Sequence, residues 1–323
     1  MTRSASQSAK PLSISQLQCE LGAMRRHGMS VKKWLATYAF YRLTTPYRWY
    51  RLNRAAAAGQ APAVVMLFHR VAPDWANEWT THTNTFERAI HWFKKRFEMV
   101  SLAEAQRRIR TGRNDRPCMT ITFDDGYAEN CDTALPLLVE EKIPCTYFVT
   151  TESVLTGQPF SHDTEMGNTF LPNTIEQLRR FADCGIEIGA HSRTHADIAQ
   201  ISDEHTLYDE VVTARDDLQD ALGHPVRWFA FPFGAPANLS RAASRLAARH
   251  DFDGVVSAYG GYNFPGDDAF HLQRIGVDGP EVRLKNWAYW DPLKQLRLPK
   301  VDLSVLAEQV DTESEIAEVC GAS

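Results

Sequence analysis

Short apolar segments alternate with helical patterns along most of the chain, beginning near residue 61. Ala63–Phe68 is a continuous apolar run, which is typical of a strand buried on both faces. The same criteria predict seven further strands, at Phe97–Val100, Met119–Phe123, Cys145–Val149, Glu187–Ala190, Trp228–Phe231, Gly254–Ser257 and Leu272–Ile275. Strands that alternate with helices favour a parallel sheet, and seven or eight of them predict a (β/α)7-8 barrel.

The helices expected between these strands have recognisable beginnings and ends. Ser101 and Glu104 form a capping-box pattern, Gly185 and Gly223 are placed to end helices, and Asn238 is the expected N-cap of the last helix. The predicted helices cover Thr85–Arg96, a segment after Ser101, Thr133–Glu141, Thr174–Cys184, Asp203–Leu222 and Leu239–Arg249.

Two segments lie outside the alternating pattern, so we expect a barrel domain at 61–295 between an N-terminal extension (1–60) and an acidic tail (296–323). The extension carries ten Lys or Arg and one acid, Glu20. Its aromatic residues are interleaved with cations in 31–42 and 46–51. Two interpretations are open: a helix that packs its aromatics on the barrel, or an interfacial element that rests on anionic lipid headgroups.

Composition narrows the class of protein. An apolar share of 44% and a charged share of 23% are ordinary for a chain with a real core, which excludes wholesale disorder. The net charge of −5 gives no reason to expect nucleic acid as a partner. Six cysteines without a CxxC pair indicate reduced thiols. With no signal peptide and no apolar run of about 18 residues, we expect a cytoplasmic protein, at the inner face of the membrane if the extension binds lipid.

Reactive side chains follow four of the predicted strands. They are His69, the pair Asp124-Asp125, the pair His191 and His195, and the segment Phe231–Gly234. Each alone has an ordinary explanation, since Asp-Asp-Gly is a common turn and paired histidines are usually incidental. Parallel strands of a barrel end on one rim, so these groups are expected to converge. Two imidazoles and a carboxylate complete a catalytic zinc shell, and a second carboxylate supplies a base.

The same residues resemble the motifs of a known family. Ile121–Gly126 is similar to the TFDDG motif of the polysaccharide deacetylases (carbohydrate esterase family 4, the NodB-homology fold), and His191–His195 to their HSxxH motif. Phe229–Gly234 resembles their third motif. Met66–Val71 resembles the segment that begins the circularly permuted members. The resemblance spans about residues 62–285 and implies a distorted barrel of the NodB-homology type.

Residue by residue, the resemblance implies a role for each motif position. Asp125, His191 and His195 would hold one divalent metal ion, with Zn²⁺ as the default for this ligand set. Asp124 would be the general base and His69 the general acid. The backbone N–H of Phe233, after Pro232, would help to bind an oxyanion.

One position departs from the family. The third motif normally supplies an Arg that pairs with the catalytic Asp, and Ala230 stands there instead. Arg274, on the last predicted strand, is the candidate replacement, with an ordinary rim salt bridge as the alternative.

The predicted function is therefore metal-dependent hydrolysis of an N-acetyl or other N-acyl group on an amino sugar of a polysaccharide or glycan. Phe233, Tyr259 and Tyr262 are candidates for stacking on sugar faces, or for packing. Three alternatives remain: a deacetylase or deformylase of a lipid-linked sugar, an amide hydrolase with a non-sugar substrate, and a silent carbohydrate-binding module. Intact carboxylate and histidine pairs argue against the last, because a binding module needs no metal and base together.

Overall fold

A computed structural model describes residues 13–74, 76–277, 279–299 and 301–303. Eight parallel strands lie in the order β1-β10-β9-β8-β7-β6-β5-β4, and a further pairing of β1 with β5 closes seven of them into a barrel with β4 beside it. The predicted (β/α)7-8 barrel is thereby confirmed. The barrel strands are β1 (Ala63–Phe68), β4 (Glu98–Met99), β5 (Cys118–Phe123), β6 (Cys145–Val149), β7 (Glu187–Ala190), β8 (Trp228–Ala230), β9 (Gly254–Ser257) and β10 (His271–Gly276).

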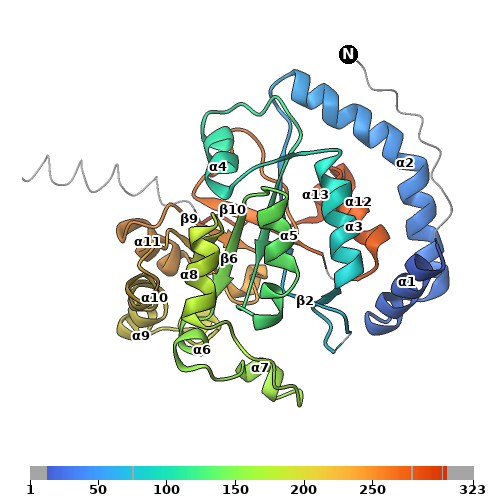
Figure 1. Ribbon diagram of the computed structural model, residues 1–323. Coiled ribbons are helices and arrows are strands. Elements are labelled where there is room, and N and C mark those ends of the chain that lie inside the picture. Colours follow the sequence, from blue (N-terminus) through green and yellow to red (C-terminus); the bar gives the residue numbers. More distant parts are fainter. Residues whose placement is uncertain (1–12, 75, 278, 300, 304–323) are drawn as a thin grey trace, which may run out of the picture.

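A small separate sheet of β2 (Arg70–Ala72) and β3 (Thr80–His82) follows β1. Helices surround the barrel on its outside (Figure 1). They are α1 (Ile14–Arg26), α2 (Val31–Ala57), α3 (Thr83–Lys94), α4 (Leu102–Arg110), α5 (Ala134–Glu140), α6 (Thr151–Thr156), α7 (Ser161–Thr164), α8 (Ile175–Asp183), α9 (Glu204–Tyr208), α10 (Ala214–Leu222), α11 (Arg241–Arg249), α12 (Glu281–Ala288) and α13 (Pro292–Arg297).

The core explains why the strand predictions succeed. Every residue of β1, β5 and β6 is buried, because side chains on one face fill the barrel and those on the other meet the helices. Phe68 and Phe123 stack on adjacent strands, with ring centroids 5.5 Å apart, and Phe86 of α3 packs edge-on against Phe68 at 5.0 Å. An apolar run buried on both faces is thus a reliable signal of a barrel strand.

Two of the helix predictions are wrong in detail. The predicted continuous helix Asp203–Leu222 is interrupted by a π-helical segment, Asp209–Thr213, between α9 and α10. Asn238 does not cap the following helix, because it ends a short 3₁₀ turn, and the side chain of Ser240 accepts the capping hydrogen bond from Ala243 N instead.

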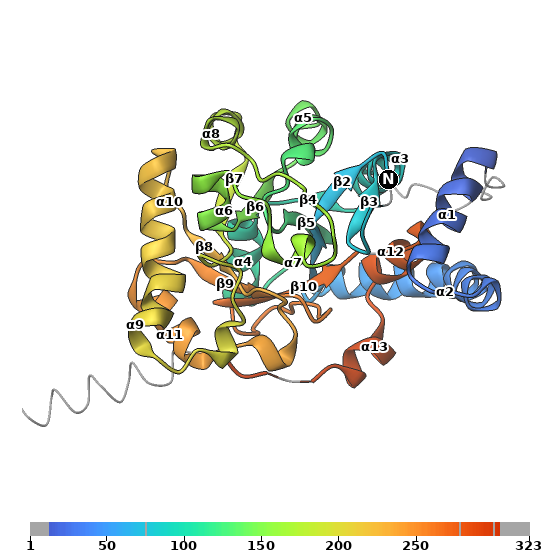
Figure 2. The same cartoon turned by 90° about the horizontal axis from the view of Figure 1, so that it is seen from below.

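The N-terminal extension forms two helices on one side of the barrel, while α9, α10 and α11 lie on the opposite side (Figures 1 and 2). Leu52 and Ala56 of α2 are buried against the barrel. No described helix is long and apolar enough to cross a membrane. The five cysteines in the described ranges are free thiols. Residues 304–323 of the predicted tail lie outside the described residues, and the division at 60 and 295 stays a prediction.

Candidate functional site

The motif residues come together where the parallel strands end. His69 follows β1, Asp124 and Asp125 follow β5, and His191 follows β7. These residues, together with His195 and Phe233, line one cavity of ≈ 230 Å³. Residues that lie up to 164 positions apart in the sequence thus share one rim, because parallel register places the carboxyl ends of the strands at the same end of the barrel.

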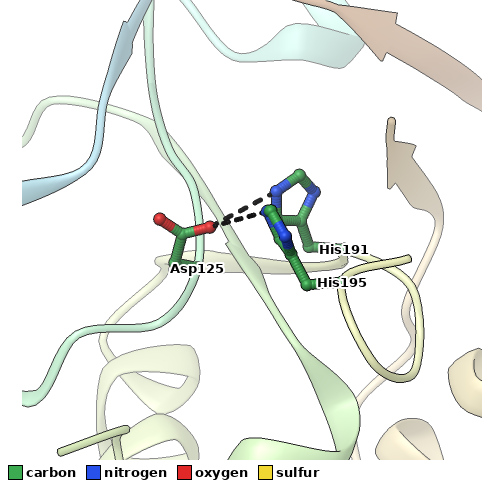
Figure 3. A group of neighbouring side chains, drawn as sticks. All are labelled: Asp125, His191 and His195. Atoms are coloured by element: carbon green, nitrogen blue, oxygen red, sulfur yellow. Dashed lines mark ion pairs between the residues drawn. The ribbon is translucent and has the colours of Figure 1, made fainter. Parts of the chain in front are cut away.

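Asp125, His191 and His195 form a compact donor cluster (Figure 3). Nε2 of His191 lies 3.5 Å and Nε2 of His195 lies 3.4 Å from the same oxygen, Asp125 Oδ1. That buried oxygen accepts no hydrogen bond from the part of the chain that the structure describes. One ligand atom from each residue lies within 4.8 Å of the others. Three donors that face a common point are the arrangement a divalent cation needs.

The electrostatics of the cluster favour an ionised carboxylate. Burial acts to raise the pKa of the Asp125 carboxyl, but the imidazoles of His191 and His195 hold that pKa well below its usual range. His191 Nδ1 lies 2.9 Å from the carbonyl oxygen of Ala230. A carbonyl only accepts, so Nδ1 carries the proton and the Nε2 lone pair is left for a cation.

Asp124 is held by an arginine from another strand. Nη1 and Nη2 of Arg274 lie 2.6 and 2.7 Å from the two oxygens of the Asp124 carboxylate, and Arg274 Nε donates to the carbonyl of Ser257 at 3.0 Å. Arg274 is completely buried. The pair is therefore bidentate, with its guanidinium completely buried, and this fixes the orientation of the carboxylate.

His69 is half-buried and lies on the wall of the same cavity as Asp124 and Asp125. Its main chain is fixed by Asn130, whose side-chain amide donates to the carbonyl of His69 at 2.8 Å and accepts from Val71 N at 2.8 Å. Asn130 is itself completely buried. Sequence reasoning missed Asn130, since a single asparagine 61 residues away carries no pattern that links it to His69.

The backbone at the rim is unusual. Six non-glycine residues in the described ranges have a left-handed φ, and four of them, Asp125, Ser192, His195 and Phe233, belong to the motifs. Such conformations cost about 1–3 kcal/mol each and cluster at functional sites. Gly234 follows with φ +59°, and a Cβ there would lie 2.6 Å from Ala258, so this turn requires glycine. Phe233 itself is 57% exposed and packs edge-on against His195.

The π-helical segment supports the histidine loop. Oε2 of Glu210 accepts hydrogen bonds from the backbone N–H groups of Arg193 (2.9 Å) and Thr194 (3.1 Å), and Oε1 accepts from the hydroxyl of Thr194 at 2.6 Å. Glu210 thereby holds the chain between His191 and His195. Isolated π turns in helices are common at functional sites, but a single sequence gives no periodic signal for one.

A second group that sequence reasoning missed lies across the cavity. Trp79 and His162 are both on its wall. The hydroxyl of Tyr127 accepts from Trp79 Nε1 at 2.9 Å and donates to the fully buried Asp163 at 2.6 Å, while His162 Nε2 lies 3.2 Å from the same hydroxyl. The rings of His162 and His195 are 4.7 Å apart. Tyr127 and Asp163 thus fix the wall that faces the metal-type donors.

A second cavity adjoins the first. It measures ≈ 320 Å³ and shares His162 and His195 with the site cavity, so the two are neighbours. Hydroxyl and amide side chains contribute much of its lining, including Ser153, Gln158 and Ser161. Of the two expectations for Tyr262, packing is the one that holds, because Tyr262 is completely buried and donates to main-chain carbonyls.

Solved structures share the fold of this barrel. The deacetylase PplD of Streptococcus pyogenes, solved with acetate, has a TM-score of 0.58 at 19% identity and covers 72% of this chain and 99% of its own. IcaB from Ammonifex degensii has a TM-score of 0.58 at 20% identity, covering 71% and 97%. A de-N-acetylase from Aggregatibacter actinomycetemcomitans has a TM-score of 0.56 at 18% identity, covering 70% and 99%.

Sequence comparison points to the same family in the middle of the chain. Residues 111–253 match the family model for polysaccharide deacetylases. A curated protein of Bacillus subtilis (strain 168), named "Putative polysaccharide deacetylase YxkH", is 22% identical over 158 residues, which are 46% of this chain. The matched stretch spans about half (51%) of that relative. This stretch, which is less than half of the chain, thus matches the polysaccharide deacetylase family, in agreement with the resemblance. His69 and Arg274 lie outside it.

Proposed function

We propose that the protein is a metal-dependent hydrolase that removes an N-acetyl or related N-acyl group from an amino sugar in a polysaccharide or glycan. The observation that carries this proposal is the convergence of Asp125, His191 and His195 on one point beside the ion-paired Asp124. The match of residues 111–253 to the polysaccharide deacetylase model supports deacetylation as the reaction class.

The donor set fits a divalent cation. Asp125 Oδ1 is buried with both imidazoles beside it, and the proton on His191 Nδ1 leaves Nε2 as a ligand. Asp125, His191 and His195 would hold the ion, and two imidazoles with one carboxylate favour zinc. A cation bound there would acidify a water molecule and polarise an acyl oxygen.

Asp124 is the proposed general base. Its carboxylate is 2% exposed and opens on the cavity, where it would take a proton from the attacking water. Arg274 pairs with both oxygens of this carboxylate and fixes its orientation, in the role that the family's third-motif Arg would have had. The small side chain of Ala230 agrees with this exchange, because the cation reaches Asp124 from β10 rather than from β8.

Two further residues complete the proposed chemistry. Phe233, which follows Pro232, lines the cavity in a left-handed turn, and its backbone N–H would donate to the oxyanion that develops on the acyl oxygen. His69 would protonate the leaving amine, since an amide anion is too poor a leaving group to depart alone. His69 occupies the wall of the cavity at the end of β1.

The shape and lining of the site suit a sugar. Trp79 and Phe233 offer aromatic faces at the cavity, and the adjoining cavity contributes hydroxyl and amide groups. Two neighbouring cavities would accept more than one sugar unit of an oligomer. A lipid-linked amino sugar is the second candidate substrate, and the exposed apolar residues of α1 and α2 favour it.

The test measures acetate and formate released from N-acylated oligosaccharides, from polyprenyl-linked amino sugars and from non-sugar acetamides. We expect acetate from the oligosaccharides, loss of activity with a chelator and its return with Zn²⁺. The Asp124→Asn variant, which keeps the shape of the side chain, is the inactive control. Release only from the lipid-linked or non-sugar substrates would replace the proposed substrate. Binding of oligosaccharides without any release would make the protein a carbohydrate-binding module.

A further inference from the structure

The N-terminal helices expose an unusual number of large apolar side chains. We call their solvent side the α1–α2 outer face. Leu43 is 81% exposed, Tyr47 62%, Tyr50 60% and Val31 58%. In α2, Val31, Leu35, Leu43 and Tyr47 recur at a spacing of four or eight residues, so they share one side of the helix. The members of the outer face are Leu17, Leu21, Val31, Leu35, Phe40, Leu43, Tyr47 and Tyr50.

The opposite side of α2 is firmly held, so the outer face is not simply a badly packed core. Leu52 and Ala56 are buried, and so is Arg48. Its guanidinium donates to Asn286 Oδ1 at 3.0 Å and to the carbonyl of Tyr289 at 2.5 Å. The helix is thus fixed to α12 and the segment after it, and its other side is left for solvent or a partner.

The charge of this surface has one sign. Lys32, Lys33, Arg42 and Arg54 of α2 are exposed. Glu20 is the only acid among residues 1–60. It is 4% exposed, and its carboxylate accepts hydrogen bonds from Trp34 Nε1 at 2.6 Å and from Glu281 N at 2.8 Å. The exposed surface of the two helices therefore presents cations and apolar groups without a compensating carboxylate.

We propose that the α1–α2 outer face binds the surface of an anionic lipid bilayer. Leucine and tyrosine side chains would enter the headgroup region, and the lysines and arginines around them would pair with lipid phosphates. Charge complementarity selects this occupant, because a mixed surface of cations and apolar groups matches both layers of an anionic membrane interface. The inference is independent of the proposed reaction, since none of these residues lines the site cavity.

Two alternatives to a lipid surface can be considered for the α1–α2 outer face: the acidic C-terminal segment and a second copy of the chain. The acidic C-terminal segment carries the opposite charge, and its described end is attached at α11, where Arg241 pairs with Asp302. That point lies on the opposite side of the barrel from α1 and α2 in both views (Figures 1 and 2). A second copy of the chain would bury the apolar residues but would bring like charges together.

The experiment is co-sedimentation of the full chain with vesicles of phosphatidylcholine alone and of phosphatidylcholine with phosphatidylglycerol. We expect binding to the anionic vesicles only, weakened at least tenfold when salt rises from about 0.1 M to about 1 M. Leu43→Glu should reduce binding at least tenfold. Leu296→Glu on α13 is the matched control, because Leu296 is 82% exposed and the charge change is the same.

A second pair of variants tests the charges. Arg42→Glu with Arg54→Glu should abolish binding to anionic vesicles, whereas Arg110→Glu with Arg297→Glu, which changes the net charge equally, should leave it. All four positions are exposed, so circular dichroism should be unchanged.

Failure of the full chain to bind anionic vesicles would overturn the proposal. Two further results would identify the occupant instead. If binding appears only after removal of residues 304–323, the acidic segment covers the face. If the chain is instead a dimer by analytical ultracentrifugation, and Leu43→Glu makes it a monomer, the face is an interface between copies. Equal vesicle binding by the Leu43→Glu and Leu296→Glu variants would also overturn the proposal.

Discussion

The rim of the barrel and the α1–α2 outer face both depend on arginine, but in opposite states. At the rim, Arg274 is completely buried, and both of its terminal nitrogens donate to the carboxylate of Asp124. On α2, Arg42 and Arg54 are exposed on helices whose single acid is turned inward.

The difference teaches what each region can do. A buried bidentate pair gives a fixed geometry, which a catalytic base requires, and it cannot be removed without leaving a charge uncompensated. Exposed cations contribute little to stability, but they are available to a partner of opposite charge. Burial, rather than residue type, separates the two roles.

The largest effect is expected at His69, which tests whether the rim acts as a catalytic unit. His69→Ala should lower kcat on an N-acetylated oligosaccharide by about 10²–10⁴-fold, because the leaving amine loses its proton donor. Metal content and the thermal unfolding midpoint should stay close to those of the unaltered protein. An activated aryl ester, which needs no protonation to depart, should show a much smaller defect. An equal loss on amide and ester would assign the acid role elsewhere.

The arginine comparison itself is tested by stability. Arg274→Met should lower the free energy of unfolding by about 3–5 kcal/mol, because the Asp124 carboxylate stays buried without its partner. Arg42→Met, at an exposed position, should change it by no more than about 0.5 kcal/mol. Urea unfolding measures both values.

Arg274→Met should also lower kcat, because Asp124 loses the bidentate contact that fixes the orientation of its carboxylate. An unchanged kcat, with stability lost as expected, would make Arg274 a purely structural residue.

A third prediction concerns buried titration away from the rim. Burial lowers the pKa of His271 to about 4, and its Nε2 lies 2.8 Å from Ser257 Oγ. As pH falls, the imidazole of His271 is therefore protonated in the unfolded chain before it is protonated in the folded protein. Its contribution to the free energy of unfolding is complete above about pH 6.5 and is lost between about pH 6.5 and 4. The loss from this group should be up to about 3 kcal/mol. In His271→Gln, the slope of unfolding free energy against pH should be smaller in this window, and an equal slope would contradict the assignment.

The smallest expected effect is at the cavity wall. Trp79→Ala should raise KM for an oligosaccharide several-fold with little change in kcat, since an aromatic face contributes about 0.5–1.5 kcal/mol to a stacked contact. Trp79→Phe, which keeps an aromatic face, should recover most of the affinity. A fall in kcat alone would place Trp79 with the catalytic groups instead.

The sequence predicts the barrel well because its strands are buried on both faces, and continuous apolar runs such as Ala63–Phe68 report that directly. It also predicts the motif residues, since parallel strands end at one rim. It could not predict Asn130, Glu210 or Tyr127, because their hydrogen bonds to distant loops arise only from tertiary packing. The π turn at Asp209–Thr213 interrupts a segment that reads as one helix, and no sequence pattern is specific to such a turn.

Arg274 could be predicted from the sequence only in part. Because Ala230 replaces the motif Arg, Asp124 needed a cationic partner from elsewhere, and the pattern placed Arg274 on the last strand. Only the folded barrel shows the bidentate contact. A departure from a family motif was therefore more informative than a match, because it directed attention to a residue outside the motifs.

The central claim is that Asp125, His191 and His195 hold the ion that makes the rim reactive. The direct test is elemental analysis of purified protein after dialysis against Zn²⁺ and then against metal-free buffer. We predict about one Zn²⁺ per chain in the unaltered protein and in Asp183→Asn, an exposed control, and almost none in Asp125→Asn or His191→Ala. Full occupancy in the Asp125→Asn and His191→Ala variants would contradict the account.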